Sequence, residues 1–321
     1  MSNGNLVSVI MSVYNEKPEW LKSCIDSILQ QTYRDLEFII ILDKPENSVL
    51  KALLLEYQQT DPRVKVSINE ENKGLIFSLN KALMLCNGDY IARMDADDIA
   101  KPHRLATQVA FLNTHKLDLV GANVELFNDE QGTFHYTDKL QTHTFLKKML
   151  EVGTIGIVHP TFFAKANVYK QLGGYGQSLH TEDKEFLARV FVNGFKVGNV
   201  NECLLSYRYS ETSITKSNSF YVFKMGKYVT DVFKNYLKTG EYKFDYNYIE
   251  QVKASDKELT AFNKKQVILG EARSAIHNKN YIRALKHLVH CIYLSKSTLL
   301  TLKINIWLKC LRAIEKRRAL K

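Results

Sequence analysis

Short apolar runs alternate with segments of helical periodicity along the first part of the chain. Between the runs, segments such as residues 17–31 and 75–86 place apolar side chains at every third or fourth position, as helices packed on a sheet do. The apolar runs, which have the length and composition of buried strands, span residues 7–13, 36–42, 64–68 and 90–94. The alternation predicts parallel βαβ units whose sheet is covered by helices on both faces.

Polar and acidic residues follow the ends of these predicted strands. In open α/β sheets, ligands bind beyond the carboxyl ends of the strands, where the loops converge. The residues at those ends are Asn15 and Glu16, Asp43, Asn69 to Asn72, and Asp95 to Asp98. We therefore expect the ligand site at this edge of the sheet.

Three carboxylates, those of Asp95, Asp97 and Asp98, fall within four positions and repel one another. One interpretation is capping of a helix over residues 98–112, but a single carboxylate satisfies that need. Burying the others unpaired would carry a severe desolvation penalty. A divalent cation relieves the repulsion, since Mg²⁺ or Mn²⁺ takes oxygen ligands from one or two carboxylates and from substrate phosphates. The run therefore favours a site for a metal and a nucleotide diphosphate.

Six ordered segments resemble a known family. They are VSVIMSVYNE, FIIILD, NEENKGLIFSLNKAL, NGDYIARMDADD, HPTFFAKANVYKQLGGY and TEDKEFLARV. Between Val7 and Ser213 the chain resembles the nucleotide-sugar transferases of glycosyltransferase family 2, especially bacterial members that add single sugars to lipid-linked oligosaccharides for capsule or O-antigen. The resemblance implies an α/β GT-A fold, with a Rossmann-like, mostly parallel sheet flanked by helices and a C-terminal helical region. It also implies metal-dependent, inverting transfer of one hexose from a UDP-sugar donor to a polyprenyl-diphosphate-linked glycan acceptor.

The resemblance assigns site residues one by one. Asp43 would accept a hydrogen bond from the uracil ring, Asp95 and Asp97 would serve a Mn²⁺ or Mg²⁺ ion, and Asp98 would position the sugar. For Arg93, a contact to phosphate and a structural ion pair both stay open. The nucleotide-sugar site would comprise Tyr14, Asn15, Glu16, Asp43, Asn72, Gly74, Arg93, Asp95, Ala96 and Arg208.

A second acidic pair, Glu182 and Asp183, begins a predicted helix that has Thr181 as N-cap and Gly194 as its stop. On their own, these carboxylates are explained by the favourable interaction of acids with a helix N-terminus. Sugar transfer also needs a base for the acceptor hydroxyl. By resemblance Asp183 would be that catalytic base, and Glu182 would position the acceptor or the base.

The resemblance implies two further features, and the chain departs from the family pattern in two places. The segment with Gly173, Gly174 and Tyr175 would wall the acceptor side, where His159 is either a site residue or a packed, hydrogen-bonded histidine. Arg208 or Ser213 in a closing loop would reach the pyrophosphate. The chain departs from the family pattern at residues 44–47, where many relatives have a glycine-rich or acidic turn. It also lacks the Gln-x-x-Arg-Trp signature of processive synthases, which favours one sugar per encounter.

The C-terminal region differs in charge from the rest of the chain. Of the net charge of +10, residues 261–321 contribute 14 basic residues against 2 acidic ones, so that the remainder is slightly acidic. We expect domains at residues 1–218 and 219–321, with a helical hairpin that turns at residues 277–280. A further helix, within residues 297–318, has a broad apolar face and basic polar positions, so it either lies on an anionic membrane or packs on the catalytic domain. The aromatic residues are not interleaved with the basic ones, which argues against nucleic-acid binding.

Composition sets the remaining expectations. The 321 residues are 45% hydrophobic, with five cysteines and no Cys-x-x-Cys pair, which indicates a globular protein with buried thiols. The sequence has no apolar stretch of about 18 residues and no signal-peptide pattern. We expect a cytoplasmic protein, peripheral at the inner face of the membrane. Two alternatives are a sugar nucleotidyltransferase, which ordinarily has a glycine-rich basic loop after its first strand, and a non-catalytic nucleotide-sugar- or membrane-binding protein.

Overall fold

The computed structural model describes residues 5–130, 132–137, 142–178, 180–209, 218–251, 255–278 and 280–294. The chain divides into two compact units. The larger unit comprises Met1–Ser217 and Met225–Tyr246, and the smaller comprises Asn218–Lys224 and Asn247–Lys321. The expected boundary at residues 218/219 falls beside the first of these division points.

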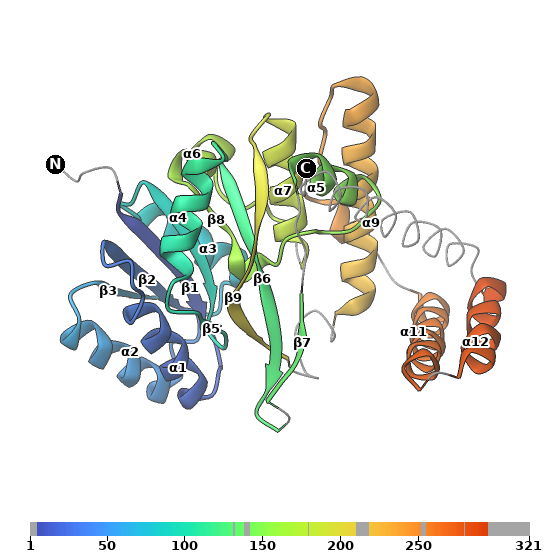
Figure 1. Ribbon diagram of the computed structural model, residues 1–321, viewed down its shortest axis with the longest axis horizontal. Helices are drawn as coiled ribbons and strands as arrows, with labels where there is room; N and C mark the ends of the chain where they lie inside the picture. The colour runs from blue at the N-terminus through green and yellow to red at the C-terminus, as the bar shows by residue number, and fades with distance from the viewer. Residues whose placement is uncertain are drawn as a thin grey trace. The chain divides into compact units, whose positions relative to one another are not determined.

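A mixed sheet organises the larger unit (Figure 1). Its strands follow the order β3-β2-β1-β4-β8-β6-β9-β5, and β7 pairs with β6. The first four run parallel, whereas β8 is antiparallel to both β4 and β6. The strands are β1 Val7–Val13, β2 Leu36–Leu42, β3 Val64–Ile68, β4 Tyr90–Asp95, β5 Ile99–Ala100, β6 Leu119–Asn128, β7 Gly132–Tyr136, β8 Phe163–Lys165 and β9 Val197–Arg208.

Helices cover both faces of this sheet (Figure 1). On one face, α1, α2 and α4 pack against alternate side chains of β1 such as Val9 and Met11. On the other face, α3, α5, α6, α7 and α9 pack around the intervening Ile10 and around Ile39. These helices are α1 Pro18–Leu29, α2 Ser48–Thr60, α3 Leu75–Leu85, α4 Arg104–Thr114, α5 His143–Glu151, α6 Ala166–Leu172, α7 Glu182–Val192 and α9 Ser219–Thr239, with a 3-10 turn η1 at His159–Thr161.

The predicted α/β fold is confirmed, including its first four strands. The runs of β1, β2 and β4 are buried almost throughout, whereas in β3, the outermost of the four, only Val64 is buried. The capping interpretation of the acidic run is wrong. Helix α4 begins at Arg104 with His103 as its N-cap, five positions beyond Asp98. The intervening Ile99–Ala100 instead forms β5, which pairs with β9, so Asp98 lies in a turn between two strands.

One carboxylate lies at the amino end of the sheet, where Glu37 occupies the second position of β2. Its side chain is only 7% exposed. It accepts hydrogen bonds from Ser8 Oγ (2.5 Å), Lys65 Nζ (2.7 Å) and two nitrogens of Asn87 (2.6 and 3.1 Å). Burial raises its pKa, but these donors outweigh burial and lower the pKa to about 2. Glu37 is therefore a fully hydrogen-bonded structural carboxylate.

The smaller unit contains the predicted helical hairpin. Helix α11 (Asp256–His277) begins with a capping box between Ser255 and Glu258, and α12 (Tyr281–Leu294) follows the predicted turn. A short helix, α10 (Tyr248–Gln251), precedes them. In the part of the chain that the structure describes, no helix is long and apolar enough to cross a membrane. The predicted helix within residues 297–318 and the predicted loop residue Ser213 lie outside the described residues.

Candidate functional site

Arg93 lies at the centre of the acidic residues that the sequence singles out. It is 3% exposed and, two residues before the end of β4, forms an ion pair with Asp95. Its Nε and Nη1 atoms are buried and have no hydrogen-bond partner within the described part of the chain. A buried guanidinium with unsatisfied donors is unusual and indicates that another acceptor belongs beside it.

The carboxylates that follow β4 are poorly compensated. Burial raises the pKa of Asp97 to about 7, with contributions from the charges of Asp95 and Glu16. Burial also raises the pKa of Asp98, which is 1% exposed, and the charges of Asp95 and Asp97 add to the effect. Asp98 Oδ1 accepts a hydrogen bond from Arg208 N (2.8 Å), but Oδ2 is without a partner among the residues described. The site therefore concentrates negative charge that the protein alone does not neutralise.

Two neighbours of this cluster were expected from the sequence. Glu16, after β1, accepts a hydrogen bond from Tyr14 N (2.8 Å), and burial raises its pKa. Arg208, at the end of β9, donates from Nε to the carbonyl of Asp97 (2.9 Å) and forms an ion pair with Asp129. Its guanidinium also lies 4.5 Å from the ring centroid of Trp20, so Arg208 supports the turn that carries Asp97.

The second acidic pair occupies the first turn of α7. Thr181 is the N-cap residue, but no side-chain capping bond forms there. Burial raises the pKa of Glu182 to about 7 and raises that of Asp183. Asp183 Oδ1 accepts a hydrogen bond from Lys184 N (2.6 Å). Both carboxyl groups therefore bind a proton more readily than ordinary surface carboxylates do.

The acidic pair on α7 lies in the same electrostatic environment as the acidic residues after β4. The charge of Arg93 lowers the pKa of both Glu182 and Asp183, and the charge of Asp95 raises that of Glu182. Electrostatic effects of this kind require proximity inside a shielded site. Contacts through η1 and the following Phe162 join the β4 end to the α7 N-terminus, since Arg93 N donates to Phe162 O (2.9 Å) and His159 Nδ1 lies 3.9 Å from Glu182 Oε1.

His159 lies between these groups. It is buried in η1, where its Nε2 is 2.9 Å from Tyr175 Oη and its Nδ1 is 3.9 Å from Glu182 Oε1. Burial and the nearby charge of Arg93 lower its pKa well below the usual value, so the ring is neutral. Arg104 fixes this arrangement, since its Nη2 donates to the carbonyls of Arg93 and Pro160, both at 2.7 Å.

Lys184 is a site neighbour that sequence reasoning missed. This buried side chain extends from α7 and donates from Nζ to the carbonyls of Gly153 (3.1 Å) and Gly226 (2.5 Å). Burial lowers its pKa to about 8. Lys184 thereby joins the first turn of α7, next to Asp183, to the turn beyond α5 and to α9. Only its place beside an acidic pair in an amphipathic helix could have indicated it.

Asp43 organises the loop that precedes α3. It is 3% exposed and accepts hydrogen bonds from Asn69 Nδ2 (2.6 Å), Lys73 N (2.8 Å) and Gly74 N (2.8 Å). Gly74 N also contacts Asn72 Oδ1 (3.1 Å). Gly74 has φ +85°, and a Cβ there would meet no atom within 4 Å, so the backbone faces open space. A glycine in this conformation lets a ligand approach the chain closely.

Residues 44–47, where the chain departs from the family pattern, contact the loop after β1. Lys44 Nζ donates to Asn15 Oδ1 (2.9 Å) and lies 5.3 Å from the ring centroid of Tyr14, which is 44% exposed. Asn47 caps α2 through Leu50 N and contacts Asn15 as well (3.4 Å). The sequence thus places a cation beside the predicted nucleoside-binding residues.

A two-way hydrogen bond fixes the turn that carries Tyr175. Asn80 of α3 donates to the Tyr175 carbonyl and accepts from Tyr175 N, both at 2.8 Å. Arg189 donates to the carbonyl of Gly174 (2.9 Å) and pairs with the fully buried Glu185. The predicted acceptor-side segment is therefore rigidly attached to α3 and α7.

The carboxylates at the β4 end suit a divalent cation whose ligands come partly from the protein and partly from water and substrate. No group of three or more His, Cys, Asp or Glu side chains in the described ranges is arranged to enclose a metal. Asp95 is partly exposed, and Asp97 is buried beside the like charges of Asp95 and Glu16. These two carboxylates could bind an ion that takes its other ligands from water and phosphate. The donor set consists of oxygen atoms, which suits Mg²⁺ or Mn²⁺.

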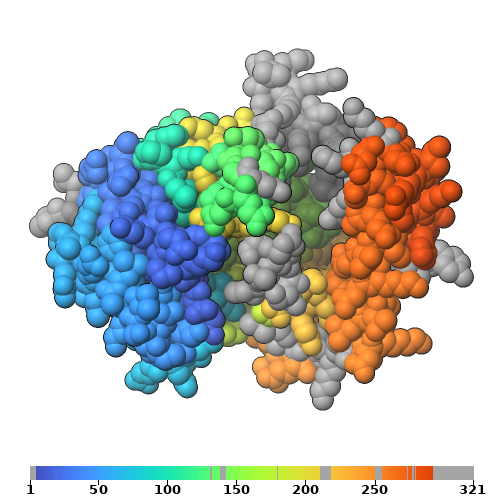
Figure 2. Space-filling model, turned by 90° about the horizontal axis from the view of Figure 1, so that it is seen from below, coloured from blue at the N-terminus to red at the C-terminus, as the bar shows by residue number. Residues whose placement is uncertain are grey.

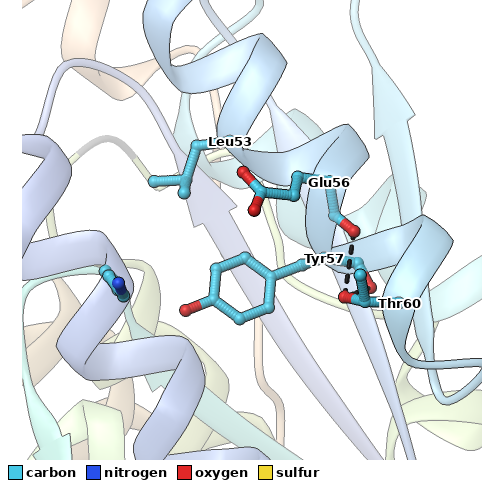
Figure 3. A pocket seen from close by; sticks show the side chains of 5 residues that line it. Leu53, Glu56, Tyr57 and Thr60 are labelled. Atoms are coloured by element: carbon cyan, nitrogen blue, oxygen red, sulfur yellow. Dashed lines mark hydrogen bonds between the residues drawn. The ribbon is translucent and has the colours of Figure 1, made fainter.

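A separate depression of about 170 Å³ lies between α1 and α2 (Figure 3). Its lining residues are Lys22, Leu53, Glu56, Tyr57 and Thr60. Tyr57 Oη donates to Asp26 Oδ1 (2.6 Å), and Thr60 Oγ1 bonds to backbone carbonyls of its own helix (Figure 3). Both hydroxyl groups there have partners within the two helices, and the depression lacks the buried acidic cluster that follows β4.

Comparison with known proteins identifies relatives of about two thirds of the chain. The chain matches the family model described as Glycosyl transferase family 2 over residues 8–173. An uncharacterised glycosyltransferase of Methanocaldococcus jannaschii is 38% identical over 63% of this chain and 70% of its own. An O-antigen biosynthesis glycosyltransferase of Escherichia coli is 34% identical over 66% of this chain and 83% of its own. An amylovoran biosynthesis glycosyltransferase of Erwinia amylovora is 32% identical over 66% and 79%.

Solved structures share the fold. A fragment of S. aureus TarS, crystallised with UDP-GlcNAc, superposes with a TM-score of 0.59 and 16% sequence identity. The alignment covers 89% of this chain and 91% of that chain. At such low identity the likeness concerns the fold alone, and it agrees with the GT-A arrangement of strands and helices described above.

Proposed function

The chain belongs to glycosyl transferase family 2, of the capsule and O-antigen type, and from this premise we propose that it transfers a single hexose from a UDP-sugar to a lipid-linked glycan. The acceptor would carry a polyprenyl diphosphate, and the product would enter surface polysaccharide biosynthesis. The reaction would be metal-dependent and would invert the anomeric carbon. The protein would work in the cytoplasm, at the inner face of the membrane.

The observation that carries this proposal is the meeting of two acidic groups around Arg93. One group, Asp95 and Asp97, suits a cation and a diphosphate, and the other, Glu182 and Asp183, suits a base. A sugar transferase needs both functions within reach of one anomeric carbon. A binding protein for nucleotide-sugars would need only the first group.

On the donor side, Asp95 and Asp97 would hold Mn²⁺ or Mg²⁺, which when bound would neutralise charge on the departing diphosphate. The unpartnered Nε and Nη1 of Arg93 would donate to a phosphate or sugar oxygen. Exposed Tyr14, with Asn15, would border the nucleoside. Because Asp43 already accepts three internal hydrogen bonds, its contribution would be to hold Gly74 open toward the donor rather than to bind uracil alone.

On the acceptor side, Asp183 would remove the proton from the attacking hydroxyl while the bond from the anomeric carbon to UDP breaks. A raised pKa suits this task, since a base works best when its pKa is near the operating pH. Glu182, next to the neutral His159, would position the acceptor. A single displacement of this kind inverts the anomeric carbon.

A binding experiment tests the donor half of the proposal. We expect UDP with Mn²⁺ to raise the melting temperature of the wild-type protein, because a ligand at 100 times its Kd stabilises a protein by about 2.7 kcal/mol. Asp97→Asn should abolish the metal-dependent part of this shift. Asp89→Asn, an exposed change at the opposite end of β4, is the matched control and should behave as wild type. Equal metal-dependent shifts for Asp97→Asn and wild type would refute the assignment, and absence of any shift with UDP would refute the donor.

A further inference from the structure

Helix α12 carries an exposed apolar arc. Tyr281, Ile282, Leu285 and Val289 are 67%, 75%, 62% and 57% exposed. At 100° per residue these four positions fall within an arc of roughly 100°, the width of the apolar face of an amphipathic helix. Four large apolar side chains gathered on one face and left in water are unusual for a soluble hairpin.

The opposite side of α12 is already used. Ala284 and Cys291 are buried, and the helix packs against α11 through its buried Ile268, Ala272 and Ala275. Pairing with α11 therefore fixes the orientation of α12 within the hairpin and leaves the apolar arc outward. In Figure 2, where colour follows residue number, α11 and α12 lie in the darkest orange and red part of the surface.

The charges beside the arc are all of one sign. Helix α12 contains Arg283 and Lys286, both exposed, and no acidic residue. At 100° per residue, Lys286 lies next to the arc, and Arg283 lies further around the helix on the same side. A helix with an exposed apolar face bordered by cations matches the boundary of an anionic bilayer, where apolar side chains enter the acyl region and cations meet lipid phosphates. A protein partner would need its own acidic rim, for which this chain gives no evidence.

We propose that the exposed face of α12, formed by Tyr281, Ile282, Leu285 and Val289 with Arg283 and Lys286, docks on an anionic lipid surface. This membrane face consists of described residues only. It is distinct from the predicted helix within residues 297–318. It deepens the proposed function, on which it rests only for the expectation that a lipid-linked acceptor is presented at a membrane. Its own evidence is the exposure and charge of α12.

Vesicle binding by the full chain tests the membrane face. Wild-type protein should float with phosphatidylcholine vesicles containing about 30% phosphatidylglycerol, and bind less to pure phosphatidylcholine or in about 0.5 M NaCl. Leu285→Glu should reduce the partition coefficient about tenfold or more, because a leucine that enters the acyl region of the bilayer would be replaced by a charge. Arg283→Glu with Lys286→Glu should weaken binding to anionic vesicles and should remove most of its salt dependence.

The control is Met84→Glu, which places a charge on another exposed apolar residue (79%), at the end of α3. It should bind vesicles as the wild type does. Binding by Leu285→Glu at the wild-type level, or failure of the wild type to bind anionic vesicles, would overturn the proposal. So would a wild-type dimer, seen by light scattering, that Leu285→Glu dissociates without any vesicle binding. Hydrolysis of UDP-sugar without acceptor, measured in parallel, reports on the catalytic site separately.

Discussion

The amino end of the sheet and the carboxyl end of β4 differ in how their buried carboxylates are stabilised. At the amino end, Glu37 accepts four hydrogen bonds and its pKa falls to about 2. At the carboxyl end of β4, burial and then the charges of neighbouring acids raise the pKa values of Asp97 and Glu182 to about 7. Burial is common to both ends, so the difference lies in the supply of donors. A carboxylate that the fold leaves unsatisfied marks the place where a ligand or a proton is to be bound.

The largest expected effect comes from removing the base at the carboxyl end. Asp183→Asn should lower the transfer rate by about 10²–10⁴-fold, because the amide cannot accept the acceptor proton. UDP and metal binding should persist, as measured by thermal shift. Glu151→Gln, a partly exposed change at the last residue of α5 that removes the ion pair with Lys148, should leave transfer unaltered. Normal transfer by Asp183→Asn would show that the base lies elsewhere.

Glu37 provides the converse test at the amino end. Glu37→Gln should lower the free energy of unfolding by roughly 2–3 kcal/mol at pH 7, since charge-assisted hydrogen bonds are replaced by a mismatched amide. The donor-binding properties of the folded fraction should be unchanged. Urea unfolding measures the loss, with the exposed Glu56→Gln as control.

The pH dependence of the Glu37 contribution has a definite sign. Because folding lowers its pKa from the usual 4.5 to about 2, the stabilisation is present above pH 4.5 and is lost as the pH falls toward 2. The difference in unfolding free energy between wild type and Glu37→Gln should shrink over that window. A constant difference would mean that Glu37 stabilises by packing rather than by charge.

The smallest effect, and one of opposite sign, is expected for Glu182. Folding raises its pKa to about 7, so the wild type loses stability as the pH rises from about 4.5 to 7, where the unfolded chain releases the proton first. Glu182→Gln should therefore stabilise the protein by roughly 1–2 kcal/mol at pH 8 while reducing transfer. The gain should vanish below pH 4.5. Lower stability of the variant at pH 8 would contradict the contrast between the two ends.

Sequence periodicity was sufficient for the parallel half of the fold. The runs that form β1 and β2 are largely apolar and rich in β-branched residues, so their burial could be predicted. The carboxyl end of β4 then located Asp95 and Asp97. The short strands β5 and β8 could not be foreseen in this way, because two or three residues carry no period. Their pairing depends on contacts far apart in the chain, as does the place of β9 beside β6.

The site was predictable in its residue types more than in its connections. Acids at strand ends pointed to Asp95 and Asp97, and the family resemblance pointed to Asp183. The central place of Arg93 depends on β4 and α7 meeting on one sheet face, and Lys184 depends on carbonyls of Gly153 and Gly226. Such partners come from the tertiary fold and leave no local signal. Their roles at the acidic site stay predictions.

The Lys184 contacts bear on where the chain can be shortened. A fragment that stopped at residue 218 would lack the Gly226 carbonyl and would leave an ammonium group in the interior with half of its acceptors. It would also lack Tyr246, whose hydroxyl reaches the buried Glu185 at 3.1 Å. The smallest fragment able to fold around Asp183 should therefore extend through Tyr246. The beginning of the C-terminal region thus belongs structurally to the unit that carries Asp183.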